Sequence, residues 1–316
     1  MKKPVAIFSF LLVAIALILL PKYAPYFYIF LATEILILGL FALSFNLSFG
    51  YTGMLSFGHA AFFGVGAYAT GMLLLWLQWP LIWCLVISTL SGALLALIFG
   101  ALCARLNEVY FAMLTLAFGM LTYSVVHQWR SVTNGSDGIS GFRVREFGLG
   151  LDLTMGNPVV YYQVVLVITA IAIGVLYLIT RSSFGMVLRA ISMNSERVSF
   201  CGLNIRHYRV AAFTISGGFA GLAGGLMAPF LRIASPELVH WSMSAEPVLM
   251  SILGGAGYFL GPLVGAAAFV LLETWITNFT QNWMLILGII LGLIVMFFRN
   301  GVLGTIIMWR EERKKS

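Results

Sequence analysis

Ionisable side chains within apolar stretches are the first candidates for chemistry in this sequence. Glu34 lies inside an apolar stretch, and Glu246 and Glu273 lie near the ends of two others. Carboxyl and imidazole groups are costly to place in hydrocarbon, and there they commonly mark proton or ion pathways. Glu34 and His59 are therefore candidate proton carriers, although no second carboxylate or His lies at helical spacing from Glu34. For His59, a hydrogen-bonded packing role is the alternative.

Residues 46–71 combine glycine with small polar side chains in the order NLSFGYTGMLSFGHAAFFGVGAYATG. Small residues let helices approach closely in lipid, and polar groups at that depth need a wet or protein-lined path. The region predicts a broken helix beside a translocation pathway, with ordinary close helix packing as the alternative. The candidate pathway residues are Asn46, Ser48, Gly50, Gly53, Ser56 and His59.

A second glycine-rich region covers residues 213–230. Gly217, Gly221 and Gly225 form two consecutive GxxxG steps, which place the glycines on one face of a helix. This face predicts close packing against another helix, either of this chain or of a partner subunit.

Motifs for nucleotide binding, metal binding and enzymatic catalysis are missing from the sequence. No Gly-Lys pair occurs, so the phosphate-binding P-loop cannot be formed by this chain. Cys84, Cys103 and Cys201 are scattered without ligand spacing. We therefore expect no enzyme, metal or cofactor here, and any ATP that is used would be bound by another chain.

The composition is that of a protein embedded in a bilayer. Hydrophobic residues make up 61% of the chain and charged residues only 9%, which predicts an all-α, polytopic integral membrane bundle. The net charge of +7 does not indicate nucleic-acid binding, because Lys and Arg gather near the termini and in residues 181–209.

Apolar stretches that approach the roughly 20 residues needed to cross a bilayer recur along the chain. A shorter stretch, 247–256, predicts a half-helix, and whether 247–276 crosses or re-enters stays open. We expect about nine or ten transmembrane or partly re-entrant helices in one domain, residues 1–316. The predicted spans are 5–20, 28–45, 57–77, 81–102, 109–127, 159–180, 210–231, 260–276 and 283–298.

The charge distribution predicts an orientation. Residues 181–209 carry five Arg against one Glu, and short basic loops stay on the cytoplasmic side. An even number of predicted spans separates Lys3 from Arg181, so we expect both termini to be cytoplasmic as well. The loop 128–158, in which acidic and basic residues balance, is then external.

Five blocks in a fixed order make the chain similar to a known family, the LivM-type permease subunits of branched-chain amino-acid ABC importers. The resemblance runs from about residue 34 to 298. The blocks are SFNLSFGYTGMLSFGHAAFFGVGAYATG, TNGSDGISGF, SSFGMVLRAISMNSERVSFCGLN, FTISGGFAGLAGGLMAP and LMSILGGAGYFLGPLVGAA.

This resemblance implies a non-catalytic subunit in a bacterial-type cytoplasmic (inner) membrane. It implies as partners a second related permease, two cytoplasmic ATPases that bind ATP and Mg, an external solute-binding protein and membrane lipid. The cargo would be branched-chain amino acids or similar small polar solutes. The exact substrate, and whether the permeases form a homodimer or a heterodimer, stay open.

The resemblance also assigns a coupling role to residues 181–209. Gly202 follows Glu196 at the spacing of the permease loop pattern, although Arg197 and Val198 replace its two alanines. Apolar residues at helical spacing would dock in a groove of an ATPase while Arg side chains bond to it. A pure topology signal is the alternative. The candidate ATPase contacts are Phe184, Leu188, Arg189, Glu196, Arg197 and Gly202.

On the external side, residues 135–141 are rich in turn formers. Ser136 and Asp137 could meet a binding protein, and a solvated turn is the alternative. Two other functions compete with the importer: a self-sufficient ion-coupled transporter that uses Glu34 and His59, and a membrane scaffold without transport.

Overall fold

The computed structural model describes residues 24–106, 108–142, 144, 147, 148 and 157–279, with isolated positions 17, 21, 22, 285, 286, 288, 289, 292, 301, 304 and 305. The predicted span 5–20 and most of 283–298 lie outside the described residues. Six helical segments of the described part are long and apolar enough to cross a membrane. They are α2 (Tyr26–Phe49), α3 (His59–Met72) with its π-helical extension η1 (Leu73–Leu77), α4 (Leu81–Cys103), α5 (Glu108–Gln128), α7 (Pro158–Arg181) and α10 (Ile205–Leu231).

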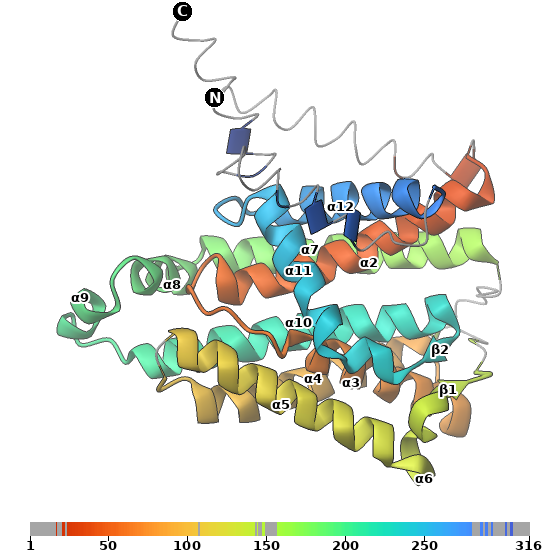
Figure 1. Cartoon of the computed structure of the whole chain (residues 1–316), viewed down its shortest axis with the longest axis horizontal. Coiled ribbons are helices and arrows are strands. Elements are labelled where there is room, and N and C mark those ends of the chain that lie inside the picture. The colour runs from red at the N-terminus through yellow and green to blue at the C-terminus, as the bar shows by residue number, and fades with distance from the viewer. Residues whose placement is uncertain are drawn as a thin grey trace, which may run out of the picture.

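The long helices lie side by side in one bundle (Figure 1). In the most apolar 18-residue stretch of each helix, 67% of the residues of α2 and of α10 are buried inside the chain. The share is 33% for α4 and α7 and 28% for α5. The central helices are therefore α2 and α10. The outer three keep apolar side chains on their surfaces, as lipid-facing helices do.

The two ends of the bundle differ. At one end α8 (Ser183–Met193) and α9 (Ser195–Phe200) project from it. At the other end lie α6 (Arg130–Thr133), η2 (Gly135–Asp137) and a two-stranded antiparallel sheet. Its strands, β1 (Ile139–Ser140) and β2 (Ile233–Ala234), tie the described part of the loop 128–158 to the end of α10.

Glycines of α10 let three helix backbones touch. A Cβ at Gly221 would meet the backbone of Gly92 on α4, and a Cβ at Gly66 on α3 would meet the backbone of Gly221. Gly224 lies in the same way against the carbonyl group of Phe63. The packing predicted for residues 213–230 is therefore made with helices of this chain.

Residues 233–254 cross the bundle as a discontinuous segment. Ala234 lies beside Gly71, and Val239 of η3 (Pro236–Val239) lies beside Gly64. Ser244 of α11 (Trp241–Gly254) then bonds to the backbone of Ala60, so the chain descends along α3 in the opposite direction. The first half is irregular and the second half is helical.

The chain returns through α12 (Gly261–Thr277), which packs against α11 where the backbones of Gly254 and Gly265 meet. The turn between α11 and α12 lies beside Gly50, at the end of the bundle that carries α8. Residues 247–276 therefore form two successive helices, α11 and α12, that pack against each other on either side of this turn.

Candidate functional site

The predicted break in the glycine-rich region lies between α2 and α3, at residues 50–58. Its backbone turns back on the last turn of α2: Gly53 N–H donates to the Phe49 carbonyl at 3.0 Å and Met54 N–H to the Ser48 carbonyl at 2.9 Å. Gly53 has a φ of 76°, a left-handed conformation that glycine adopts without steric cost. The break is therefore an ordered turn inside the bundle.

His59 is the first residue of α3 and is fully buried. Its Nε2 lies 3.2 Å from the Ser44 Oγ. The imidazole stacks on Phe41 and meets further rings edge-on, those of Phe45, Phe62 and Phe213. Its Nδ1 is buried without a hydrogen-bond partner among the described residues. The aromatic enclosure suits a packing residue, and the unpartnered nitrogen leaves the choice between a packing role and a pathway role for His59 open.

Asn46 and Ser56 flank the break with polar atoms that have no hydrogen-bond partner in the described part of the chain. Both atoms of the Asn46 side-chain amide are buried without a partner, and so is the Ser56 Oγ. A buried polar group left unpaired costs about 1–3 kcal/mol. In a native protein interior, such groups are normally hydrogen-bonded to water or to a ligand, or they find a partner in a second conformation. Ser48, by contrast, bonds to the carbonyl of Phe45 at 2.9 Å.

The candidate pathway residues do not converge on one site. The Ser44 carbonyl accepts from Ser216 Oγ of α10 at 2.5 Å, so the His59 side of the break faces α10. Asn46 lies against Gly50, which packs on the Ala256 carbonyl of the α11–α12 turn. The break thus contacts two different parts of the bundle.

Residues 181–209 form two short helices and the first turn of α10. The apolar face of α8 points inward: Leu188 and Ile191 are buried, and Phe184 stacks on Tyr208 of α10. The expected docking of Phe184 and Leu188 in an ATPase groove therefore does not fit this structure. The amphipathic pattern was correct, but the bundle of this chain covers its apolar side.

Arg189 reaches from α8 to the break, although the residue stays exposed. Its Nη2 donates to the Tyr51 hydroxyl at 3.2 Å, and its Cζ lies 4.7 Å from the centre of the Tyr51 ring. Tyr51, in the break, is only 4% exposed. A guanidinium over an aromatic face is held by the ring quadrupole, so Arg189 links α8 to the break.

The outward surface of this end belongs to α9. Met193, just before it, and Phe200, at its end, are each 88% exposed, and Glu196 and Arg197 are exposed between them. The Asn194 side chain caps α9 by accepting from the Arg197 N–H at 3.0 Å. Gly202 follows with a φ of 79°, the left-handed conformation that commonly ends a helix.

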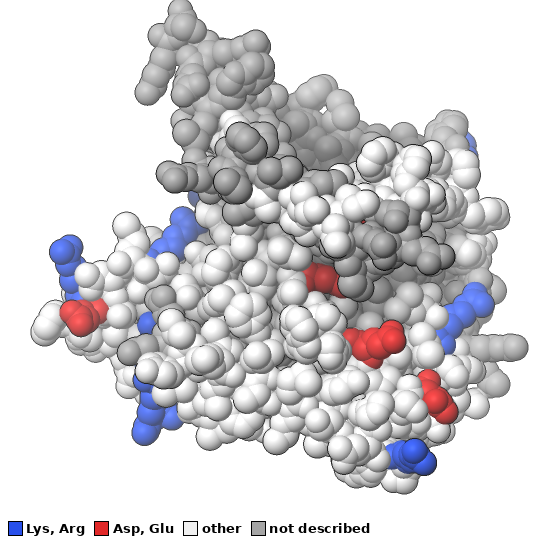
Figure 2. Space-filling view, in the orientation of Figure 1, with Lys and Arg blue, Asp and Glu red and all other residues white. Residues whose placement is uncertain are grey.

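Basic side chains mark the ends of the bundle. On the face drawn in Figure 2 they leave the broad middle free of Lys and Arg. The end that carries α8 and α9 has the larger share among the described residues. The basic residues there are Arg105, Arg181, Arg189, Arg197, Arg206 and Arg209, against Lys22, Arg130 and Arg232 at the other end.

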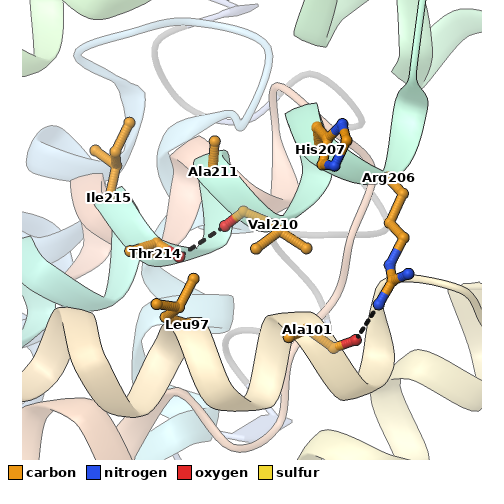
Figure 3. A pocket seen from close by; sticks show the side chains of 8 residues that line it. All are labelled: Leu97, Ala101, Arg206, His207, Val210, Ala211, Thr214 and Ile215. Atoms are coloured by element: carbon orange, nitrogen blue, oxygen red, sulfur yellow. Dashed lines mark hydrogen bonds between the residues drawn. The ribbon is translucent and has the colours of Figure 1, made fainter.

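A hollow of about 520 Å³ opens on the flank of the bundle between α4 and α10 (Figure 3). Apolar side chains line most of it, and Arg206 closes one end by donating to the Ala101 carbonyl at 3.0 Å. None of the candidate pathway residues lines this hollow. It is therefore separate from the break.

Three carboxylates that lie far apart in the sequence approach one another. Glu34 of α2, Glu246 of α11 and Glu273 of α12 are close enough to interact electrostatically. Spacing along one helix could not predict this, because each comes from a different helix. Within the described residues no group of His, Cys, Asp or Glu side chains is placed to hold a metal ion.

Ser136 and Asp137 lie exposed at the opposite end, in η2. The Ser136 Oγ donates to Asp137 Oδ1 at 3.2 Å. Thr133 and Gly135 beside them are buried, so the turn is anchored while these two side chains face outward.

A helical bundle with apolar outer helices, a buried turn between α2 and α3 and a discontinuous segment at 233–254 has the features of a polytopic membrane protein, and irregular backbone inside such a bundle is common in transporters. The sequence family described as "Branched-chain amino acid transport system / permease component" matches residues 27–298. The chain belongs to this family, which confirms the resemblance seen in the sequence.

Individual relatives agree with the family. The high-affinity branched-chain amino acid transport system permease protein LivM of Escherichia coli (strain K12) is 27% identical, over 86% of this chain and 69% of its own length. A probable branched-chain amino acid transport permease protein LivH of Methanocaldococcus jannaschii is 26% identical, over 82% of this chain and 84% of its own. The xylose transport system permease protein XylH of Escherichia coli (strain K12) is 30% identical over 32% of this chain. No solved structure matches the chain.

Proposed function

We propose that this chain carries branched-chain amino acids, or similar small polar solutes, as one of two permease subunits driven by partner ATPases. The family and the relatives support the cargo class. The missing P-loop in the sequence supports an arrangement in which ATP and Mg are bound by other chains. In this proposal residues 1–316 act as one transmembrane domain without catalytic residues.

The end that carries α8 and α9 is proposed to be cytoplasmic. Six of the described Arg residues lie there, and loops rich in Lys and Arg stay on the cytoplasmic side of a bacterial-type inner membrane. The end with Ser136 and Asp137 is then external, where it would receive a solute-binding protein. Both termini would be cytoplasmic.

The observation that carries the ATPase contact is the exposure of Met193 and Phe200 at 88% each on a projecting segment. Large apolar side chains that project past the membrane-crossing helices gain little from lipid, and they are typical of sites that bind a partner. Arg197 and Glu196 between them supply charge-assisted contacts. This surface, formed by residues 193–202, replaces the inward face of α8 as the proposed docking site.

Alternating access follows from the two discontinuous elements. The first turn of α3, which directly follows the break at 50–58, bonds to the crossing at 233–254 through Ala60 and Ser244. Irregular backbone within a bundle is where transporters open and close a path. ATP-driven movement of the ATPases would push the docking surface and rock the two permeases between inward-open and outward-open states.

Affinity purification tests the proposal. A tagged chain extracted from its native membrane in mild detergent is expected to retain a second permease and two chains with Walker motifs. Phe200→Asp combined with Arg197→Glu should release the ATPases. Trp129→Asp combined with Arg130→Glu, the same changes at exposed residues of the opposite end, should retain them. Retention of the ATPases by the first double variant would contradict the docking surface, and a wild-type chain purified alone would contradict the importer.

A further inference from the structure

We infer that the Arg189–Tyr51 pair transmits movement of the coupling segment to the break between α2 and α3, so that Tyr51 is a positioning residue for transport. The inference rests on the proposed function, and it adds a specific contact inside this chain. It concerns how a push at the docking surface reaches the interior.

The position of Arg189 makes it a connector. Leu188 and Ile191 hold α8 against the bundle through buried apolar contacts. Only Asn194 separates α8 from α9, so a push on α9 acts directly on α8. Arg189 extends from the same helix to Tyr51 with both a hydrogen bond of 3.2 Å and a ring contact of 4.7 Å. Because the hydrogen bond and the ring contact differ in geometry, together they fix both the distance and the orientation of the Arg189 guanidinium relative to Tyr51.

Tyr51 passes the contact on to the backbone of the break. Its N–H donates to the Asn46 carbonyl at 3.2 Å, and the N–H of its neighbour Gly50 donates to the same carbonyl at 2.8 Å. Gly50 packs directly on the Ala256 carbonyl, in the turn between α11 and α12. A displacement of Tyr51 therefore acts on the end of α2, on the unpaired Asn46 amide and on the discontinuous crossing.

The strength of the pair suits a switch rather than a permanent clamp. Arg189 is exposed while Tyr51 is buried, so their cation–π contact is of the weaker, partly solvated kind. Such an interaction can be made in one transport state and released in another within the energy that ATP-driven closure supplies. Tyr51 as a residue is almost fully buried, and its hydroxyl accepts a hydrogen bond from Arg189, so this bond forms only while α8 is in place.

A second Arg–Tyr pair at the same end provides a matched control. The Arg181 Cζ lies 5.2 Å from the centre of the Tyr177 ring, and both residues belong to α7. This contact has the same chemistry but does not reach the break. Loss of Arg181 removes a cation–π contact and a basic charge without removing the link.

The test uses the complete assembly in proteoliposomes, with radiolabelled L-leucine as the probe and its uptake per ATP hydrolysed as the readout. Arg189→Met and Tyr51→Leu should keep the ATPases bound and hydrolyse ATP while uptake per ATP falls about five-fold or more, the loss expected for a contact of about 1 kcal/mol. The double variant should be no worse than either single variant, because the two residues act as one unit. Tyr51→Phe, which keeps the ring, should lose less, and Arg181→Met should resemble the wild type.

Each other outcome overturns a distinct claim. Unchanged uptake per ATP in Arg189→Met, or losses that multiply in the double variant, would remove the transmitting role. Release of the ATPases from Arg189→Met would make Arg189 a docking residue, which contradicts this inference and leaves the importer intact. A wild-type assembly whose uptake needs no ATP would contradict the proposed function itself.

Discussion

Ser244, in the first turn of α11, accepts a hydrogen bond of 2.9 Å from the backbone N–H of Ala60, in the first turn of α3. The two helices thus begin beside each other inside the bundle, and each follows a stretch without regular α-helix. The first N–H groups of a helix have no partner within it, so Ser244 satisfies one of these donors where water is excluded.

Replacing Ser244 should therefore destabilise the protein. Ser244→Ala leaves the Ala60 N–H buried without a partner, which costs about 1–3 kcal/mol. The expected result is a lower midpoint of thermal unfolding in detergent. Ser242→Ala is the control, because Ser242 lies on the same helix, is exposed and contacts only His240. Equal midpoints for the two variants would argue against a structural role of the Ser244 contact.

Two glycines should respond in opposite ways to a methyl group. A Cβ at Gly224 would run into the carbonyl group of Phe63, whereas nothing lies within 4 Å of a Cβ at Gly174. Gly224→Ala should cost about 1–3 kcal/mol through overpacking. Gly174→Ala, on the exposed side of α7, should be neutral or stabilise by up to about 1 kcal/mol. Detergent stability of both variants checks this, and a tolerated Gly224→Ala would mean that α3 and α10 are less closely packed.

The cysteines offer a direct test of orientation. Cys201 is exposed beside α9, while Cys84 and Cys103 are buried. A membrane-impermeant maleimide should label Cys201 in inside-out vesicles and not in intact cells, and Cys201→Ser should abolish the labelling. Labelling of Cys201 in intact cells would place α8 and α9 outside and reverse the proposed topology.

The three approaching carboxylates should not drive transport. Glu34→Gln removes one ionisable carboxyl from the group contributed by α2, α11 and α12. We expect ATP-dependent uptake within about two-fold of the wild type, because the proposed mechanism has no proton-carrying step at Glu34. In a second experiment a protonophore is added to the assembly, and the ATP-dependent uptake should stay unchanged. Abolished uptake in this variant, with the protein still folded, would favour the ion-coupled alternative.

Much of the bundle could be predicted from hydropathy. The six described spans begin and end within a few residues of the predicted ones, because the bilayer sets both their length and their composition. The break at 50–58 was also predictable, since glycines and small polar residues interrupt an apolar run there. The glycine face of α10 was visible, although its partners α3 and α4 were not.

The irregular half of the crossing at 233–254 could not be predicted in the same way. Pro236, Glu237 and His240 interrupt any apolar window there, and burial against α3 and α5 compensates for the missing hydropathy. Contacts between residues far apart in the sequence could not be predicted either. Arg189 was expected to face an ATPase, because no sequence pattern connects it with Tyr51.

The central claim is that this chain moves solute only as part of an ATP-driven assembly. The most direct measurement compares L-leucine uptake by proteoliposomes that contain the chain alone, under a proton or sodium gradient, with uptake by the complete assembly supplied with ATP. The account predicts no uptake by the chain alone and ATP-dependent uptake by the assembly. Gradient-driven uptake by the chain alone would contradict it.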